Sequence, residues 1–459
     1  MLGAIANTFS NCFKIPELKS RIIFTLLILA VCRVIAFIPV PGLDGHALQE
    51  WFDKNAGQLS GSVLGTYSLF TGGALQKCAI GALGIMPYIT ASIIVQLLTT
   101  VVPSLAKQAR EEGGRANIIK LSRYITVLLC LGHGTLMTIG WENPGTLFKG
   151  FTGNLVLVDN IWWYRIQTIL ILTTGTMLLM WLGEQITERG IGNGISLVIT
   201  VGIVADLPMA AQQLTTMFFP PEGVDRQFNG FHFIGLVLLL LAVTAGVIAV
   251  TQAQRKIPVQ YAQRAVGRKV YSGSSSFMPL RVNHAGVMPI IFAQAILMFP
   301  AMIFEKLGQM TGYPFLTNIG VALNSGHLAY YILYTLMILF FSYFWVATQF
   351  NELQISDDLK KHGGYIPGVR PGQATSDFLH RTMSRITLAG AIFLTLIALI
   401  PMLMGQFFGI DQYVSQFFGG TSMLITVGVV LDTMRQMETH LLMRHYDGFL
   451  KKGRVKGRF

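Results

Sequence analysis

The sequence predicts an all-α polytopic membrane protein with ten transmembrane helices. Two observations support this fold class. The chain is 52% hydrophobic and only 12% charged, whereas an average soluble domain is about 25% charged. Apolar runs also recur along its 459 residues, and they are continuous, whereas the strands of a membrane barrel alternate apolar with polar residues.

Each predicted span is an apolar run bounded by polar, glycine-containing or proline-containing segments. The ten spans are expected at Ile22–Ile38, Cys78–Leu98, Ile118–Ile139, Ile166–Leu182, Ile195–Leu207, Phe231–Thr251, Val287–Phe304, Leu328–Thr348, Ile386–Met404 and Thr421–Met437. The fifth span is short, and the glycines at 190, 192 and 194 let the backbone turn into it. Residues 1–20 do not resemble a cleaved signal peptide and are expected at the cytosolic interface.

The distribution of basic residues predicts the orientation of the spans. Of the 34 Lys and Arg residues, 27 fall on the side that carries both termini and 6 on the other, with Arg33 inside the first span. The positive-inside rule therefore places both termini in the cytoplasm. Because five spans that start inside finish outside, the halves 1–230 and 231–459 are expected to have inverted topology.

The stretch Gly61–Leu98 is almost uncharged, with Lys77 as its only ionised side chain, and it is too long for one span. Gly72 and Gly73 divide it. Its first piece, Gly61–Thr71, reaches only about 16 Å as a helix and cannot cross a hydrocarbon core of about 30 Å. Such a helix must be buried in protein or line a cavity. Two interpretations stay open: a plug that moves, and a re-entrant packing segment that does not.

Two cytosolic loops, Gln252–Ala285 and Asn351–Arg385, are longer than thirty residues, although helix connections usually need 2–8. Both are basic. The simplest interpretation is that their charge only fixes the orientation of the spans. Their length favours a docking surface for an anionic partner, such as RNA or an acidic protein surface.

No set of residues in the sequence predicts catalysis. The chain lacks an H-E-x-x-H motif and a supported G-x-S-x-G motif. The glycine-rich segment Gly190–Gly194 has no P-loop lysine, so it does not predict a nucleotide site. The four cysteines have no paired spacing, which argues against a disulfide framework and a zinc site. We therefore expect a protein that is not an enzyme and needs no cofactor and no metal. Arg33 and His133 are most simply structural residues within their spans.

Four segments resemble a known family. G-A-L-G-I-M-P-Y-I-T-A-S-I-I-V-Q-L-L at Gly81–Leu98 resembles the second-span signature of the SecY family, the channel subunits of the bacterial Sec translocon. W-L-G-E-Q-I-T-E-R-G-I-G-N-G-I-S at Trp181–Ser196 resembles its second signature. G-G-Y-I-P-G-V-R-P-G at Gly363–Gly372 resembles the tip of its fifth cytosolic loop, and F-G-G-T-S at Phe418–Ser422 resembles the start of its last span.

The resemblance implies two inverted five-helix halves that form an hourglass channel with a short plug helix at 61–71. The expected plug residues are Gly61, Leu64, Tyr67, Phe70, Gly72 and Gly73. The expected constriction is a ring of isoleucines, which can seal against ions by dewetting and still yield around a chain. Its members are Ile85, Ile89, Ile199, Ile291 and Ile425. The expected lateral gate contains Thr90, His133, Gln294 and Phe299.

The function implied by the resemblance is that of a protein-conducting channel in the bacterial plasma (inner) membrane. It would translocate unfolded secretory proteins outward and release transmembrane segments laterally into lipid. The implied partners are the small membrane subunits SecE and SecG, the SecA motor, the translating ribosome, signal-sequence-bearing polypeptide substrates and the lipid bilayer. Motor or ribosome docking is expected at Arg255, Lys256 and Arg370.

The main alternative is an inverted-repeat secondary transporter for a small solute, which would need polar groups that converge at the membrane midplane. The expected constriction contains only isoleucine, which favours the channel. An intramembrane protease is a third possibility, but the sequence lacks the residues for it.

Overall fold

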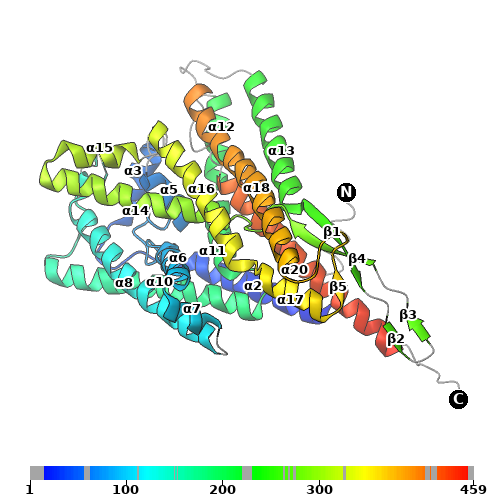
Figure 1. The fold of residues 1–459 in the computed structure, drawn as a ribbon. Coiled ribbons are helices and arrows are strands. Elements are labelled where there is room, and N and C mark those ends of the chain that lie inside the picture. Colours follow the sequence, from blue (N-terminus) through cyan, green and yellow to red (C-terminus); the bar gives the residue numbers. More distant parts are fainter. Residues whose placement is uncertain are drawn as a thin grey trace. The chain divides into compact units, whose positions relative to one another are not determined.

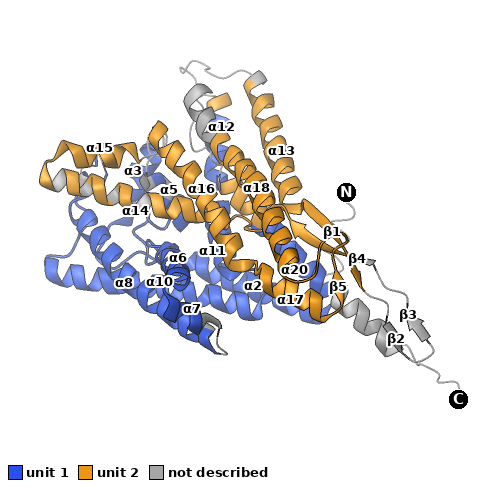
Figure 2. Cartoon of the chain, in the orientation of Figure 1, with its two compact units in different colours: residues 1–216, 429–459 blue, residues 217–428 orange. Residues whose placement is uncertain are grey.

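Helices dominate the structure, as the apolar composition predicts (Figure 1). It is a computed structural model that describes residues 15–55, 63–110, 113–148, 150–151, 153–219, 230–261, 264–266, 269–271, 275–323, 327–408, 414 and 421–452. The chain divides into two compact units (Figure 2). The first contains residues 1–216 and 429–459, and the second contains residues 217–428.

The first unit is built from helices that follow one another along the chain. They are α2 (Pro16–Ile35), α3 (Gly45–Lys54), α5 (Val63–Thr71), α6 (Met86–Val101), α7 (Pro103–Arg110), α8 (Gly114–Glu142), α9 (Pro144–Leu147), α10 (Ile161–Arg189), α11 (Gly194–Ala205) and α12 (Leu207–Phe218). Helix α20 (Thr421–Lys452) starts in the second unit and continues in the first, since the boundary follows Gly428.

The second unit combines long helices with two small sheets. Its helices are α13 (Gly230–Gln252), α14 (Met288–Thr311), α15 (Pro314–Ala322), α16 (Leu328–Gln349), α17 (Glu352–Lys361) and α18 (Gln373–Phe408). Its strands are β1 (Gln254–Tyr261), β2 (Arg264–Val266), β3 (Lys269–Tyr271), β4 (Ser275–Arg281) and β5 (Gly364–Tyr365).

Each of the ten predicted spans overlaps a helix of the structure. Among the described residues, six segments are long and apolar enough to cross a membrane. They are Ala116–Glu142, Ile161–Arg189, Gly194–Phe218, His232–Gln252, Leu328–Lys361 and Gln373–Ile400. The chain is therefore a multi-pass membrane protein.

Two predicted span boundaries are wrong. The second span was expected from Cys78, but residues 72–85 form turns and the helix starts at Met86, with Pro87 in its first turn. Proline suits that position because the first amides of a helix have no partner within it. The fifth span was expected to be short. It continues instead from α11 through Asp206 into α12, and the whole apolar segment has 25 residues.

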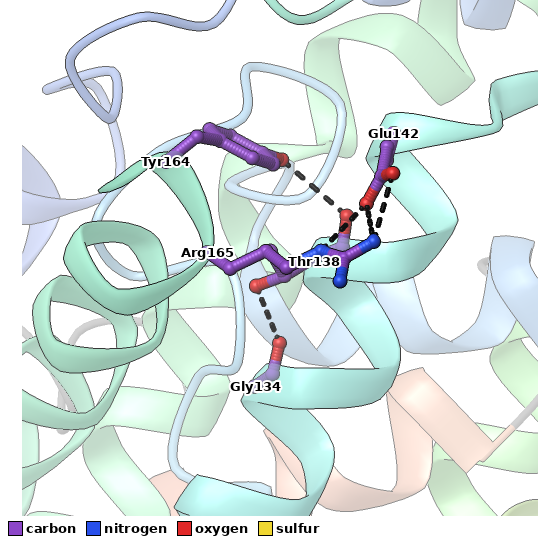
Figure 3. Close-up of polar contacts among 5 residues, drawn as sticks. All are labelled: Gly134, Thr138, Glu142, Tyr164 and Arg165. Carbon is purple, nitrogen blue, oxygen red and sulfur yellow. Dashed lines mark hydrogen bonds and ion pairs between the residues drawn. The ribbon is translucent and has the colours of Figure 1, made fainter. Parts of the chain in front are cut away.

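Helices α8 and α10 pack against each other and are joined by ion pairs at both ends. Arg165 of α10 binds the Glu142 carboxylate of α8 in a bidentate manner, with its Nε and Nη2 2.9–3.0 Å from the two oxygens (Figure 3). At the other end, Arg123 donates to Glu184 at 2.7 Å. Glu142 lies 19 residues after Arg123, and Glu184 lies 19 residues after Arg165. This spacing is about 28 Å of helix, close to the thickness of a hydrocarbon core.

Between these ion pairs, two buried hydroxyl groups find partners in backbone carbonyls of α8. The buried Tyr164 of α10 donates to the Thr138 carbonyl of α8 at 3.4 Å, and the Thr138 hydroxyl donates to the Gly134 carbonyl at 2.7 Å (Figure 3). Buried polar groups need such partners because apolar surroundings offer no water.

The two long basic loops fold together, which the sequence analysis did not predict. Strands β1 and β4 pair antiparallel from Gln254↔Arg281 to Gln260↔Ser275, and β5 joins the other edge of β1, giving the order β4-β1-β5. One face of this sheet covers an apolar cluster. The cluster is Ile257, Val259, Leu280, Ala285, Val346, Phe350, Ile366, Leu379, Met383 and Ile386. The loops thus form a folded element at the ends of α16 and α18.

Candidate functional site

Helix α5 is the short apolar helix that the sequence predicts as a plug. Its 9 residues span about 14 Å, too little to cross a membrane. Tyr67 and Phe70 are buried, and the Tyr67 hydroxyl donates to the Leu83 carbonyl at 3.1 Å. The helix packs against α11. The predicted plug residue Gly61 and the side chain of Leu64 lie outside the described residues.

The helix ends where the two glycines predict an interruption. Gly72 and Gly73 have φ of +61° and +77°, a backbone region that favours glycine. A Cβ atom on Gly72 would lie 2.8 Å from the Cα of Gly202 in α11. Only glycine fits this position, for both its backbone angle and its close approach to the neighbouring helix.

Ile85 lies next to the end of the predicted plug. It caps the start of α6 and is 2% exposed. Ile85, Phe70 and Thr71 line a small cavity of about 30 Å³, with Arg33 and Gly202 also on its wall. The structure therefore brings one predicted constriction residue and the carboxyl end of α5 to a common cavity within the first unit.

The other four predicted constriction residues are also buried. Ile89 of α6 and Ile199 of α11 belong to the first unit, with exposed fractions of 5% and 2%. Ile291 of α14 and Ile425 of α20 belong to the second unit, with exposed fractions of 1% and 0%. The convergence of all five isoleucines in one ring stays a prediction.

The predicted lateral-gate residues divide between the units in the same way. Thr90 of α6 donates to the Met86 carbonyl of its own helix at 3.1 Å, and His133 is half-buried in α8, which packs against α6. Gln294 of α14 is 6% exposed. The side chain of Phe299 lies outside the described residues. A common seam of these four residues stays a prediction.

The three predicted docking residues belong to the folded basic loops of the second unit. Arg255 and Lys256 are exposed on β1, beside the buried residues Ile257 and Val259. Arg370 is exposed in the loop that follows β5, between glycines with positive φ at 368 and 372. The Ser356 hydroxyl donates to the Gly372 carbonyl at 2.6 Å and fixes this loop against α17. The basic side chains of two distant loops are thus carried by one folded element.

The glycine-rich segment 190–194 is a structural junction. The Ile191 amide donates to the Thr25 hydroxyl of α2 at 3.1 Å, and the Gly192 amide donates to the Gln436 side chain of α20 at 2.8 Å. Gly192 has φ of +90°. The glycines therefore let the backbone turn into the fifth span, as predicted. The amides of this segment also bind side chains of the first and last spans.

Sequence analysis missed the partners of Arg33. Its Nη1 donates to the Gly72 carbonyl at 2.6 Å. Asp206, at the junction of α11 and α12, is 9% exposed and interacts electrostatically with Arg33. A signal was present in the sequence, because Asp206 is an acidic residue inside an otherwise apolar run.

The fold is shared with solved channels. A structure described as "The structure of a protein conducting channel" superposes with a TM-score of 0.59 at 17% identity, covering 97% of this chain and 99% of that one. Canine Sec61 in a ribosome-channel complex gives a TM-score of 0.55 at 18% identity, covering 97% of this chain and 99% of that one. The chain therefore has the fold of these channel structures.

Sequence comparison identifies the family of the chain. A family model for SecY matches residues 79–434. Protein translocase subunit SecY of Chlamydia trachomatis is 41% identical, over 98% of this chain and 99% of that protein. The Escherichia coli K12 subunit is 43% identical, over 96% of each chain. The chain belongs to the SecY family.

Family membership confirms three predictions from the sequence. They are the family itself, the helical channel fold, and the function as a protein-conducting channel that is not an enzyme.

Proposed function

We propose that this chain is the channel subunit of a translocon in the bacterial plasma membrane, with both termini in the cytoplasm. It passes unfolded secretory proteins outward and releases transmembrane segments sideways into lipid. The observation that carries the proposal is identity of 41–43% with protein translocase subunits over nearly the whole chain. The bias of basic residues toward one side supports the orientation.

In the resting channel, α5 is the plug and the five isoleucines form the seal. The burial of Tyr67 and Phe70 and the cavity that Phe70 shares with Ile85 support this assignment. Aliphatic side chains offer no hydrogen bonds to water or ions, so a narrow ring of them stays dry until a polypeptide separates it.

Lateral release uses a seam that contains Thr90, His133, Gln294 and Phe299. The burial of Gln294 in α14 supports a position away from lipid, because an amide group in hydrocarbon is costly without partners. Polar groups at this seam favour a closed gate until an apolar signal sequence replaces their contacts.

The folded basic loops are the docking surface for the translating ribosome and for the SecA motor, and SecE and SecG complete the complex. Exposed Arg255, Lys256 and Arg370 on one element support this role. Related Sec61 and Ssh1 channels were solved in complexes with ribosomes. Energy for transport comes from the SecA motor or from the translating ribosome.

The test is transport into sealed vesicles that contain the purified chain with SecE and SecG. We expect a secretory polypeptide with a signal sequence to become protected from protease when SecA and ATP are added. Protection must disappear when the vesicles are opened with detergent. Vesicles that protect no polypeptide but accumulate a small solute would contradict the channel and favour a transporter.

A further inference from the structure

A polar network surrounds the turn that follows α5. Arg33 lies in the first span, and its guanidinium reaches across to the Gly72 carbonyl, which is 39 residues away, at 2.6 Å. A hydrogen bond from a charged donor is roughly twice as strong as a neutral one. Gly72 is the first residue after α5, so this bond fixes the carboxyl end of the helix to α2.

The turn is enclosed on both sides. A Cβ atom on Gly72 would lie 2.5 Å from Arg33 Nη1 and 2.8 Å from the Gly202 Cα of α11. The end of α5 is therefore held between α2 and α11. Movement of this turn away from Arg33 breaks the bond between the guanidinium and the Gly72 carbonyl.

Asp206 supplies the negative charge of this network. The residue is 9% exposed, and its Oδ2 has no hydrogen-bond partner among the described residues. Arg33 and Lys77 interact with it electrostatically. A buried carboxylate requires neighbouring positive charge, so Asp206 favours the guanidinium of Arg33 at this place even when the Gly72 carbonyl is absent.

The aromatic ring of Phe37 contacts both Arg33 and Lys77. The guanidinium carbon of Arg33 lies 5.1 Å from the centre of the Phe37 ring, and the Lys77 ammonium lies 3.4 Å from it. Both distances are typical of cation–π contacts. Arg33 is thus oriented by an aromatic ring in the turn that follows α2, and Lys77, which belongs to the turns after Gly73, contacts the same ring.

We propose that Arg33 is the latch that holds the carboxyl end of α5 in its resting position, with Asp206 as its counter-ion. Release of the helix breaks the bond between Arg33 and the Gly72 carbonyl. Asp206 keeps the guanidinium in place during the open period, so the bond can form again when α5 returns. The latch rests on the proposed role of α5 as a plug, but it can be tested separately.

The direct test follows the exposure of α5 itself. Ser68 of α5 is 1% exposed, and Ser68→Cys is a small change. In a chain whose four native cysteines are replaced by alanine, within the complete resting complex, the rate of labelling by a water-soluble maleimide reports how often α5 is released. We expect Arg33→Gln to accelerate labelling about tenfold or more, as expected for loss of a charge-assisted hydrogen bond.

Three further variants separate the latch from a general loss of packing. Arg165→Gln removes an arginine that pairs with Glu142 and should leave the labelling rate unchanged. Arg33→Lys keeps the charge and should label at a rate between those of wild type and Arg33→Gln. Asp206→Asn should accelerate labelling about threefold, because it weakens the bond without removing it.

Wild-type labelling rates in both Arg33→Gln and Asp206→Asn would overturn the proposal. Equal acceleration by Arg165→Gln would also overturn it, since any lost ion pair would then suffice. If the Arg33→Gln protein does not accumulate in cells, Arg33→Lys takes its place. Wild-type labelling rates in both Arg33→Lys and Asp206→Asn would then overturn the proposal. Deletion of residues 61–71 tests the plug separately: unchanged resting ion conductance would contradict the plug, whereas the labelling rates still decide the latch.

Discussion

The hydrogen bond between Tyr67 and Leu83 offers a sharp test of α5 as a movable plug. Both residues are buried, and the bond is 3.1 Å long. Tyr67→Phe removes one hydroxyl and keeps the ring that fills the space around it. A buried neutral hydrogen bond contributes about 1 kcal/mol, so the resting position of α5 should lose about that much free energy. The population of released α5 should then rise roughly fivefold.

Single-channel recording in planar bilayers measures this population directly. The purified complex, without motor, ribosome or substrate, opens when α5 leaves its place. We expect the fraction of time in the conducting state to rise roughly fivefold in Tyr67→Phe, with an unchanged single-channel conductance, because the pore itself is not altered.

Tyr164→Phe is the matched control. Tyr164 is equally buried and donates to the Thr138 carbonyl at 3.4 Å, but that bond joins α10 to α8. This variant should lose stability without conducting more often. A wild-type open fraction in Tyr67→Phe would refute the reasoning, and so would an equal increase in both variants.

Three other predictions concern the seal, the docking surface and pH. Ile85→Gly with Ile425→Gly should raise resting ion conductance about tenfold or more, because a narrow ring without aliphatic side chains fills with water; wild-type conductance would remove both residues from the constriction. Arg370→Glu should insert normally but lose SecA-driven transport in vesicles, and Arg370→Lys should transport partially, because lysine lacks the planar donor fork; full transport by Arg370→Glu would contradict docking there. Burial and Arg281 lower the pKa of His284, so the folded chain favours its neutral form. The contribution of neutral His284 to the free energy of unfolding is fully present above about pH 6.5. It decreases as the pH falls through the lowered pKa. Thermal unfolding in detergent should therefore show a lower midpoint at pH 5 than at pH 7.5, and a smaller difference in His284→Phe. An equal difference in both proteins would contradict this role of His284.

Much of the fold follows from hydrophobic run length alone. Each of the ten predicted spans overlaps a helix, because an uninterrupted apolar stretch in a membrane protein must satisfy its backbone internally. The interruption at Gly72 and Gly73 was also predictable, since both residues adopt positive φ. Sequence resemblance supplied the family, which composition could not.

Other features could not be predicted from run length. Residues 78–85 carry no charge and continue directly into the apolar run that follows, so only Pro87 indicated where α6 begins. Strand β1 alternates buried Ile257 and Val259 with exposed residues, but the basic side chains around them suggested a loop. The contact between Arg33 and Gly72 joins residues 39 positions apart, and no local pattern encodes such a distance.

The most direct test of a protein-conducting channel is to find the polypeptide inside it. A photo-crosslinking amino acid at Ile199, buried in α11, should crosslink to a secretory polypeptide arrested halfway through the membrane. The same probe at Leu170, which is 57% exposed on α10, should crosslink to lipid and not to the arrested chain. Crosslinking at Leu170 but not at Ile199 would contradict the claim that the polypeptide passes through this subunit.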